Sequence, residues 1–353
     1  MSDPVSTTNS AGAAPGPSPV PAWHDQLDQP TVDAVVDRLA SACREHRTVV
    51  LAGHVSPDGD ALGSALALHL ALGAAGARTL PTIGEAPLEL EPALALLPGI
   101  EALVPVADLP PASEIDLLVA LDTAGPARLG TVTEHLDAGV PTIVLDHHER
   151  GVPFGELSLV APGAAATVQV VALLLDELDL PLTRDVATCL YVGLVTDTGR
   201  FSYEATGPDA HLLGARLLAA GVDQATWSQR LFETRRLDDL TLLGRALGRA
   251  GFVPEVALVH THLLPEDLAV AAEGSTEGLI DLLRTADVAE VALTLRPAPD
   301  GSWRGSLRSR GRVDVGRIAA ALGGGGHRLA AGFDADGTAE TVVEQVVALL
   351  REG

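Results

Sequence analysis

The chain has 353 residues, of which 47% are hydrophobic and 3% aromatic, enough for two domains with cores made mainly of Ala, Leu and Val. Its formal net charge of −24 excludes long-range attraction to duplex nucleic acid, because neutralising phosphates requires a basic surface. Two cysteines, Cys43 and Cys189, cannot form a disulfide framework, so we expect a cytoplasmic protein.

The first 28 residues predict a disordered tail. Pro, Ser, Gly and Ala dominate this stretch, which lacks the basic start and the apolar segment of a secretory signal. Elsewhere no run of residues is apolar and long enough to span a membrane, so we expect no membrane partner.

From residue 29 to residue 222, helices alternate with short runs of β-branched and aliphatic residues. The expected helices are 31–43, 61–76, 166–178 and the buried 184–199, and the expected strands are 47–53, 78–84, 115–122 and 141–146. This alternation predicts an α/β domain with a parallel, doubly wound sheet.

A polar, arginine-rich helical stretch at 223–250 predicts a connector. Two β-rich runs follow it, at 255–263 and 288–311, and the second contains the turn sequence Asp-Gly. A last helix is expected at 338–352. We therefore expect a smaller, mixed α/β domain over residues 251–353.

Acidic and imidazole side chains follow four apolar runs of the first domain. They are His54, Asp58 and Asp60 after the first strand, Asp122 after the third, Asp146, His147 and His148 after the fourth, and Asp197 after the buried helix. Ligands of open parallel sheets bind beyond the carboxyl ends of the strands, so these side chains are expected at one edge. Carboxylates and imidazoles without thiolates suit Mn²⁺ or Mg²⁺, and so many anionic ligands favour two ions.

Each position has a simpler interpretation when it is taken alone. Asp60 could cap the following helix, Asp122 could cap a turn, and the histidine pair could lie in a solvated loop. The joint pattern favours a site, because each acid ends an apolar run where a neutral turn residue would be less costly.

Four motifs resemble those of the DHH phosphoesterase superfamily: "HVSPDGDALGS", "LDTA", "LDHHE" and "GLVTDTGRFSY". The resemblance implies two Mn²⁺ ions, with Mg²⁺ or Co²⁺ as substitutes. The implied ligands are His54, Asp58, Asp60, Asp122, His147 and Asp197. It also implies that Asp122 bridges the ions, that His148 faces the scissile phosphate, and that Asp146 orients the histidines.

Four consecutive glycines precede His327 in the second domain, and seven arginines against two aspartates lie between Arg296 and Arg328. Such a segment can form an anion-binding nest, or it can end a helix and continue as a flexible loop. Together with "SLRSRG" it resembles the DHH-associated domain. The resemblance implies a nucleotide site made by Arg308, Arg310, Gly323, Gly324, Gly325, Gly326 and His327.

Motif order and chain size are most similar to those of the bacterial oligoribonucleases within this superfamily. This implies hydrolysis of short RNA oligomers to 5′-mononucleotides and dephosphorylation of 3′-phosphoadenosine 5′-phosphate. A cyclic di-AMP or pApA phosphodiesterase and a nucleotide-binding sensor without catalysis are the alternatives. The preferred substrate, the cleavage polarity, the metal used in the cell and homodimerisation stay open.

Overall fold

The computed structural model describes residues 23–86, 88, 90–149, 151–269 and 278–352. These residues divide into two compact units, unit 1 and unit 2, and the boundary lies between Glu233 and Thr234. The boundary falls within the stretch 223–250, for which the sequence predicts a connector. Among the helices in these ranges, none has the length and apolar character needed to cross a membrane.

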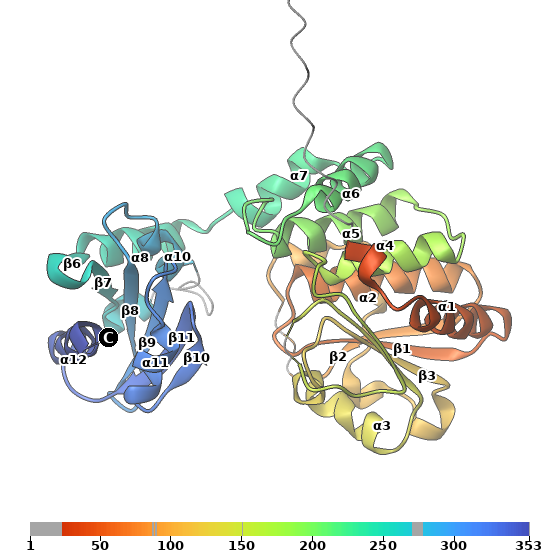
Figure 1. Cartoon of the computed structure of the whole chain (residues 1–353), viewed down its shortest axis with the longest axis horizontal. Coiled ribbons are helices and arrows are strands. Elements are labelled where there is room, and N and C mark those ends of the chain that lie inside the picture. The colour runs from red at the N-terminus through yellow and green to blue at the C-terminus, as the bar shows by residue number, and fades with distance from the viewer. Residues whose placement is uncertain (1–22, 87, 89, 150, 270–277, 353) are drawn as a thin grey trace, which may run out of the picture. The chain divides into compact units, whose positions relative to one another are not determined.

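Unit 1 contains a five-stranded parallel sheet with helical segments on both faces (Figure 1). Its strands are β1 (Thr48–Gly53), β2 (Arg78–Ile83), β3 (Leu117–Leu121), β4 (Thr142–Asp146) and β5 (Leu157–Val160). Its α-helices are α1 (Gln29–Arg44), α2 (Gly59–Ala74), α3 (Thr133–Asp137), α4 (Thr167–Glu177), α5 (Arg184–Asp197), α6 (Pro208–Ala219) and α7 (Gln224–Ser228). The order β2-β1-β3-β4-β5 confirms the predicted doubly wound sheet.

Shorter helical turns connect these elements. The 3-10 turns are η1 (Trp23–Gln26), η2 (Leu94–Leu96), η3 (Ile100–Ala102), η4 (Val106–Asp108), η5 (Ala112–Glu114) and η6 (Pro126–Val132), and η7 (Gln229–Glu233) is a π-helical turn. Strands β1, β3 and β4 are buried along their whole length, as expected for a parallel sheet covered on both faces.

Residues 23–28 of the predicted tail belong to the folded part of unit 1. Residues 1–22 lie outside the described part of the chain, but Trp23 is buried in the core of unit 1. Asp28 caps α1, because its carboxylate accepts a hydrogen bond from the backbone N–H of Thr31. The prediction of disorder is therefore wrong for residues 23–28.

Helix α2 is buried on almost every side and crosses α5 at close range. A Cβ atom at Gly63 would lie 2.4 Å from the carbonyl oxygen of Cys189, so only glycine fits there. The helix begins at Asp58, whose carboxylate accepts from the backbone N–H groups of Asp60 and Ala61 at 2.9 and 3.0 Å. The capping residue is therefore Asp58, not Asp60.

Unit 2 contains a six-stranded mixed sheet of order β10-β11-β9-β8-β7-β6. Its strands are β6 (Gly251–Val253), β7 (Leu258–His262), β8 (Val291–Pro297), β9 (Trp303–Ser309), β10 (Gly325–His327) and β11 (Ala330–Ala335). Its helices are α8 (Leu237–Gly248), η8 (Pro254–Val256), α9 (Pro265–Leu268), α10 (Leu279–Arg284), α11 (Val315–Ala321) and α12 (Ala339–Glu352). Among the described strands of this sheet, β7 and β8 pair in parallel and the other neighbours pair antiparallel, which confirms the predicted mixed α/β fold.

The α2–α5 crossing predicts the effect of one methyl group. We expect Gly63→Ala to lower the free energy of unfolding by about 1–3 kcal/mol, because the added Cβ forces the helices apart. The matched control is Gly73→Ala in the same helix, where the nearest atom to the new Cβ is 3.4 Å away. The control is expected to be neutral or stabilising by up to about 1 kcal/mol. Urea denaturation followed by circular dichroism measures both, and equal effects would contradict the close crossing.

Candidate metal centre

The candidate site lies at the carboxyl edge of the unit 1 sheet, where the strand order reverses. β1 and β3 are neighbours, but β2 lies beyond β1 and β4 lies beyond β3. Open α/β sheets bind ligands at such a switch point. His54 directly follows β1 and Asp122 directly follows β3, so both residues lie there.

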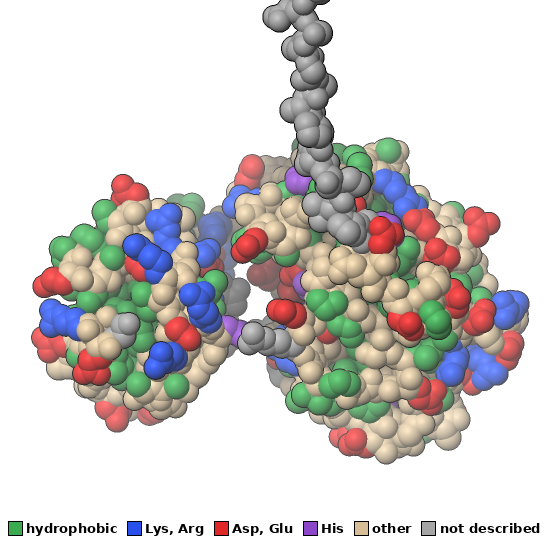
Figure 2. All heavy atoms as spheres, in the orientation of Figure 1, with side chains coloured by type: hydrophobic (Ala, Val, Ile, Leu, Met, Phe, Trp, Pro, Cys, Tyr) green, Lys and Arg blue, Asp and Glu red, His purple; other side chains and the backbone are tan. Residues whose placement is uncertain are grey.

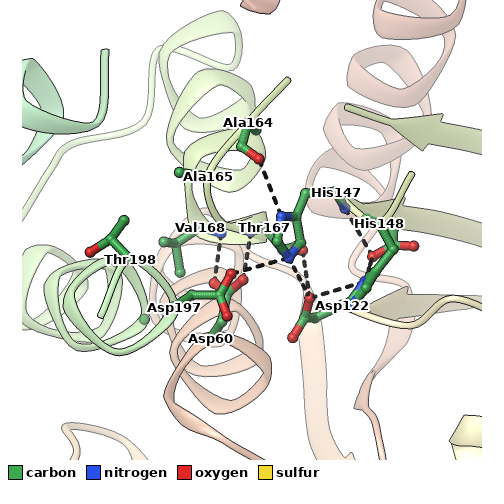
Figure 3. Close-up of polar contacts among 12 residues, drawn as sticks. Asp60, Asp122, His147, His148, Ala164, Ala165, Thr167, Val168, Asp197 and Thr198 are labelled. Atoms are coloured by element: carbon green, nitrogen blue, oxygen red, sulfur yellow. Dashed lines mark hydrogen bonds and ion pairs between the residues drawn. The ribbon is translucent and has the colours of Figure 1, made fainter. Parts of the chain in front are cut away.

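Asp122 stands between two histidines. Its Oδ2 atom lies 3.4 Å from Nε2 of His54. Its Oδ1 atom lies 3.5 Å from Nε2 of His147 (Figure 3). A carboxylate oxygen of Asp58 lies 3.6 Å from His54, and one of Asp197 lies 3.2 Å from His147. Each histidine therefore faces Asp122 and one further carboxylate.

Among the described residues, three groups of side chains could each hold a metal ion, because the ligand atoms within each group lie within 4.8 Å of one another. They are His54, Asp58 and Asp122; Asp60, His147 and Asp197; and Asp122, His147 and His148. The first two groups together contain the six side chains that the family resemblance implies as ligands. Carboxylate oxygens and imidazole nitrogens suit hard or borderline divalent cations, so the residues present could hold a metal ion.

Asp60 is the most deeply buried acid of this cluster, fully shielded from solvent. Its carboxylate accepts from the backbone N–H groups of Thr167 and Val168, at 2.6 and 2.9 Å. Burial, together with the negative charges of Asp122 and Asp197, raises the pKa of Asp60 well above its usual range. A cation at this place would relieve both the desolvation and the repulsion.

Two further groups of the cluster hold their protons tightly. Burial raises the pKa of Asp197 to about 6, although His147 opposes the shift and Asp122 adds to it. Burial lowers the pKa of His54, but hydrogen bonds to Asp122 and Asp58 outweigh burial and raise it to about 10. Metal ions and protons therefore compete for the same atoms.

Asp146 orients the ring of His148. Its Oδ1 atom accepts from Nδ1 of His148 at 2.7 Å, and this hydrogen bond raises the pKa of His148. From His147 the same oxygen accepts a hydrogen bond of the backbone N–H, at 2.9 Å, and not of the ring. The carbonyl oxygen of Ala164, 3.2 Å from Nδ1, orients the ring of His147 instead. The expectation that Asp146 orients both rings is therefore wrong for His147.

Strained backbone surrounds the cluster. Asp122 adopts a left-handed conformation with φ of 55°, which costs a non-glycine residue about 1–2 kcal/mol. Its backbone N–H nevertheless donates to the carbonyl of Leu145 at 3.0 Å, which holds the residue at the strand end. Residues 199–201, just beyond Asp197, are also left-handed. Strain of this kind persists where the surrounding structure fixes it, and it is typical of functional sites.

Thr167 belongs to the site but was not predicted. Its hydroxyl donates to Oδ1 of Asp122 at 3.0 Å, while its backbone N–H reaches Asp60. The first turn of α4 thus fixes both buried acids. The sequence signal is weak, because a threonine at the start of an apolar helix is equally typical of an ordinary helix terminus.

Three arginines of unit 2 line a pocket of about 380 Å³ on one face of its sheet. Arg308, Arg304 and Arg296 contribute guanidinium groups, and Ser306 and Thr294 contribute hydroxyls between them. Figure 2 shows arginine side chains gathered on the displayed face of unit 2. Unit 2 therefore presents a local cluster of arginines in an acidic chain.

Arg308 and His327 lie on the same face of this sheet. Both pair with Ala330, from the two strands that flank it, so the three side chains form one row across β10, β11 and β9. Arg310 differs, since its guanidinium donates to the carbonyls of Ala286 and Asp287 at 3.1 and 3.5 Å. Arg310 is not one of the described residues that line the pocket.

The four glycines divide between two roles. Gly323 is left-handed, with φ of 83°, and the N–H groups of Gly323 and Gly324 donate to carbonyls of α11. These two residues end the helix in a Schellman motif, the simpler of the interpretations considered for the sequence. Gly325 and Gly326 pair with β11. A Cβ at Gly325 would meet nothing within 4 Å, so this position is open to an approaching ligand.

The fold and the cluster together define an α/β protein with a candidate metal centre at the switch point of its parallel sheet. Residues 48–194 match the model of the DHH family, N-terminal domain, and residues 267–352 match the DHHA1 domain. A solved structure of an exopolyphosphatase-related protein from Bacteroides fragilis superposes with a TM-score of 0.83. That likeness covers 92% of this chain and 97% of the other at 24% sequence identity, and it concerns the fold.

Curated proteins are similar over both units. The chain is 38% identical over 308 residues to the bifunctional oligoribonuclease and PAP phosphatase NrnA of Thermus thermophilus, covering 84% of this chain and 89% of that protein. It is 27% identical to the cyclic-di-AMP phosphodiesterase GdpP of Geobacillus thermodenitrificans, covering 82% of this chain and 45% of that protein. The chain belongs to the DHH family. It is a hydrolase of phosphoester bonds.

The protonation of the cluster predicts how stability depends on pH. The folded protein binds protons at Asp197 and His54 more tightly than the unfolded chain does, so stability falls as pH rises through their folded pKa values of about 6 and about 10. We expect the thermal midpoint of metal-free protein to fall by roughly 5 °C or more between about pH 6 and about pH 9. Added Mn²⁺ should reduce this fall, because it binds the folded state and displaces protons.

Two variants test which group causes this dependence of the thermal midpoint on pH. The midpoint is measured by differential scanning calorimetry in EDTA. His54→Gln should flatten the dependence, because it removes the group that titrates across this range. His24→Gln, a substitution of an exposed histidine far from the cluster in sequence, should leave it unchanged. A His54→Gln slope as steep as that of the unmodified protein would contradict the assignment.

Proposed function

We propose that the chain is a manganese-dependent phosphoesterase that hydrolyses short oligoribonucleotides to 5′-mononucleotides and dephosphorylates 3′-phosphoadenosine 5′-phosphate. The observation that carries the proposal is Asp122, whose two carboxylate oxygens each face one histidine at the switch point. The 38% identity to a bifunctional oligoribonuclease and PAP phosphatase supports this substrate class.

The proposal assigns two Mn²⁺ ions to the cluster, with Mg²⁺ or Co²⁺ as substitutes. The residues that would hold them are His54, Asp58, Asp60, Asp122, His147 and Asp197. Asp122 is assigned to both ions, because it belongs both to the group with His54 and Asp58 and to the group with His147 and His148. When bound, a pair of divalent ions supplies Lewis acidity toward the phosphate and lowers the pKa of water.

His148 is assigned to the scissile phosphate. Asp146 keeps a proton on Nδ1 of His148 and fixes the orientation of the ring, which leaves Nε2 for the substrate. The His148 side chain is 44% exposed, so Nε2 is accessible to a ligand. The imidazole can therefore donate a hydrogen bond to a phosphate oxygen or a proton to the leaving oxygen.

Unit 2 is assigned to nucleotide binding. In this proposal residues 29–222 form the catalytic domain, 223–250 the connector and 251–353 the nucleotide-binding domain. Arg308 and His327 share one face of the sheet, beside the open position at Gly325. Guanidinium groups bind phosphates well, and a local arginine cluster suits a short anionic oligomer in a chain of net charge −24.

Degradation of cyclic di-AMP or pApA is the second candidate, favoured by the likeness to a cyclic-di-AMP phosphodiesterase. A sensor without catalysis is disfavoured, because burying Asp60 and Asp122 without compensation destabilises a protein that needs only to bind a nucleotide. These candidates make different demands on substrate length and on metal dependence.

Incubation of a 5′-labelled RNA trimer with Mn²⁺ separates the candidates, with and without excess unlabelled 3′-phosphoadenosine 5′-phosphate. We expect stepwise release of mononucleotides, suppressed by the competitor because one centre serves both substrates. If the trimer stays uncut while cyclic di-AMP or pApA is turned over rapidly, the result would favour the second candidate, a phosphodiesterase of these signalling nucleotides. Binding of these nucleotides without turnover of any would support the sensor.

The shared role of Asp122 predicts a loss of activity without a loss of fold. Asp122→Asn should lower kcat by at least roughly a thousandfold, because the neutral amide is a poor ligand for either ion. The same change removes a buried negative charge, so the thermal midpoint of metal-free protein should stay the same or rise. Asp137→Asn, an exposed site in α3, is the control and should keep full activity. Turnover within tenfold of the unmodified enzyme in Asp122→Asn would contradict the proposal.

A further inference from the structure

The side chain of Arg128 reaches the candidate metal centre. Arg128 lies in the 3-10 turn Pro126–Val132, which follows β3 and Asp122. Its Nη2 atom lies 2.9 Å from Nδ1 of His54. Neither the motifs of the sequence nor the groups of potential ligands include this arginine.

The backbone at Arg128 is fixed, although the residue is exposed. Its carbonyl oxygen accepts from the backbone N–H of Val55 at 2.8 Å, and the next residue, Leu129, is fully buried. The carbonyl oxygen of Leu129 also lies close to Gly84, since a Cβ atom added to Gly84 would be 1.8 Å from that oxygen. The backbone position of Arg128 is therefore fixed, while its exposed side chain is free to turn.

The contact between Arg128 and His54 lacks a suitable acceptor. Nδ1 of His54 also lies 2.8 Å from the carbonyl oxygen of Val55, and one ring nitrogen cannot both donate to Val55 and accept from Arg128. Nε2 faces the carboxylates of Asp58 and Asp122. A ring that binds a cation through Nε2 carries its proton on Nδ1, where it donates to Val55. A protonated ring likewise leaves no acceptor for Arg128.

Arg128 also has no carboxylate partner among the residues that the structure describes. The acids nearest to His54, Asp58 and Asp122, face Nε2 of that histidine instead. A guanidinium carries five N–H donors in a planar fork that matches a phosphate group. An unpaired guanidinium beside a phosphoesterase centre is therefore suited to an anionic oxygen of the ligand.

We propose that Arg128 binds a non-bridging phosphate oxygen of the substrate at the metal centre. The assignment rests on the proposed function, since it takes the cluster to be the place where a phosphoester is held. The guanidinium turns from His54 to the phosphate while the backbone of Arg128 stays attached to Val55. Arg128 is then a substrate-binding residue, not a group that positions His54.

Titration calorimetry of Arg128→Gln and Arg128→Lys with Mn²⁺ and adenosine 5′-monophosphate tests this role. We expect Arg128→Gln to weaken nucleotide binding by the Mn²⁺-loaded protein about tenfold or more. Mn²⁺ binding itself should change by less than about threefold, because His54 keeps its bond to Val55. Arg128→Lys keeps the charge but not the planar fork of donors, so its nucleotide affinity should lie between those of the unmodified protein and Arg128→Gln. Arg78→Gln, at the opposite end of β2, is the matched control for the lost charge.

Unchanged nucleotide affinity in Arg128→Gln would overturn the proposal. Weakened Mn²⁺ binding with proportionate loss of nucleotide binding would overturn it too, because Arg128 would then act through His54. Neither result depends on turnover of RNA. An unmodified protein that binds the nucleotide with Mn²⁺ but cleaves no oligoribonucleotide would reject the proposed function, while the comparison among the arginine variants would still decide the role of Arg128.

Discussion

Five carboxylates converge at one edge of the unit 1 sheet, and three of them, Asp60, Asp122 and Asp146, are almost completely removed from solvent. Backbone N–H groups, a threonine hydroxyl and two histidines offset part of this negative charge. The remainder raises the pKa of Asp60 and of Asp197. An arrangement of this kind is unfavourable for the protein alone and becomes favourable when cations are bound.

The fold supplies the geometry that this concentration of charge requires. The sheet order brings the ends of β1 and β3 together, so residues that lie far apart in the sequence meet at the switch point. The close approach of α2 and α5 at Gly63 holds the two helices that carry Asp60 and Asp197. Backbone strain at Asp122 is maintained by its hydrogen bond to Leu145. Function therefore depends on packing at positions that never touch a substrate.

Much of this could be predicted from the sequence, because strands and helices of unit 1 have clear periodicity and the acids follow them directly. Contacts set by tertiary packing could not be predicted. Thr167 looks like an ordinary helix terminus until α4 meets the acids, and the carbonyl of Ala164 carries no sequence signal at all. The four glycines also differ in role, which their identical sequence does not indicate. Gly323 and Gly324 end a helix, while the space beside Gly325 is empty.

The central claim is that one buried carboxylate, Asp122, is shared by two metal ions. Native mass spectrometry of the intact chain titrated with Mn²⁺ tests it most directly, by counting the ions bound per chain. We predict two ions for the unmodified protein and no more than one for Asp122→Asn. A single ion in the unmodified protein, or two ions retained in Asp122→Asn, would contradict the shared role of Asp122.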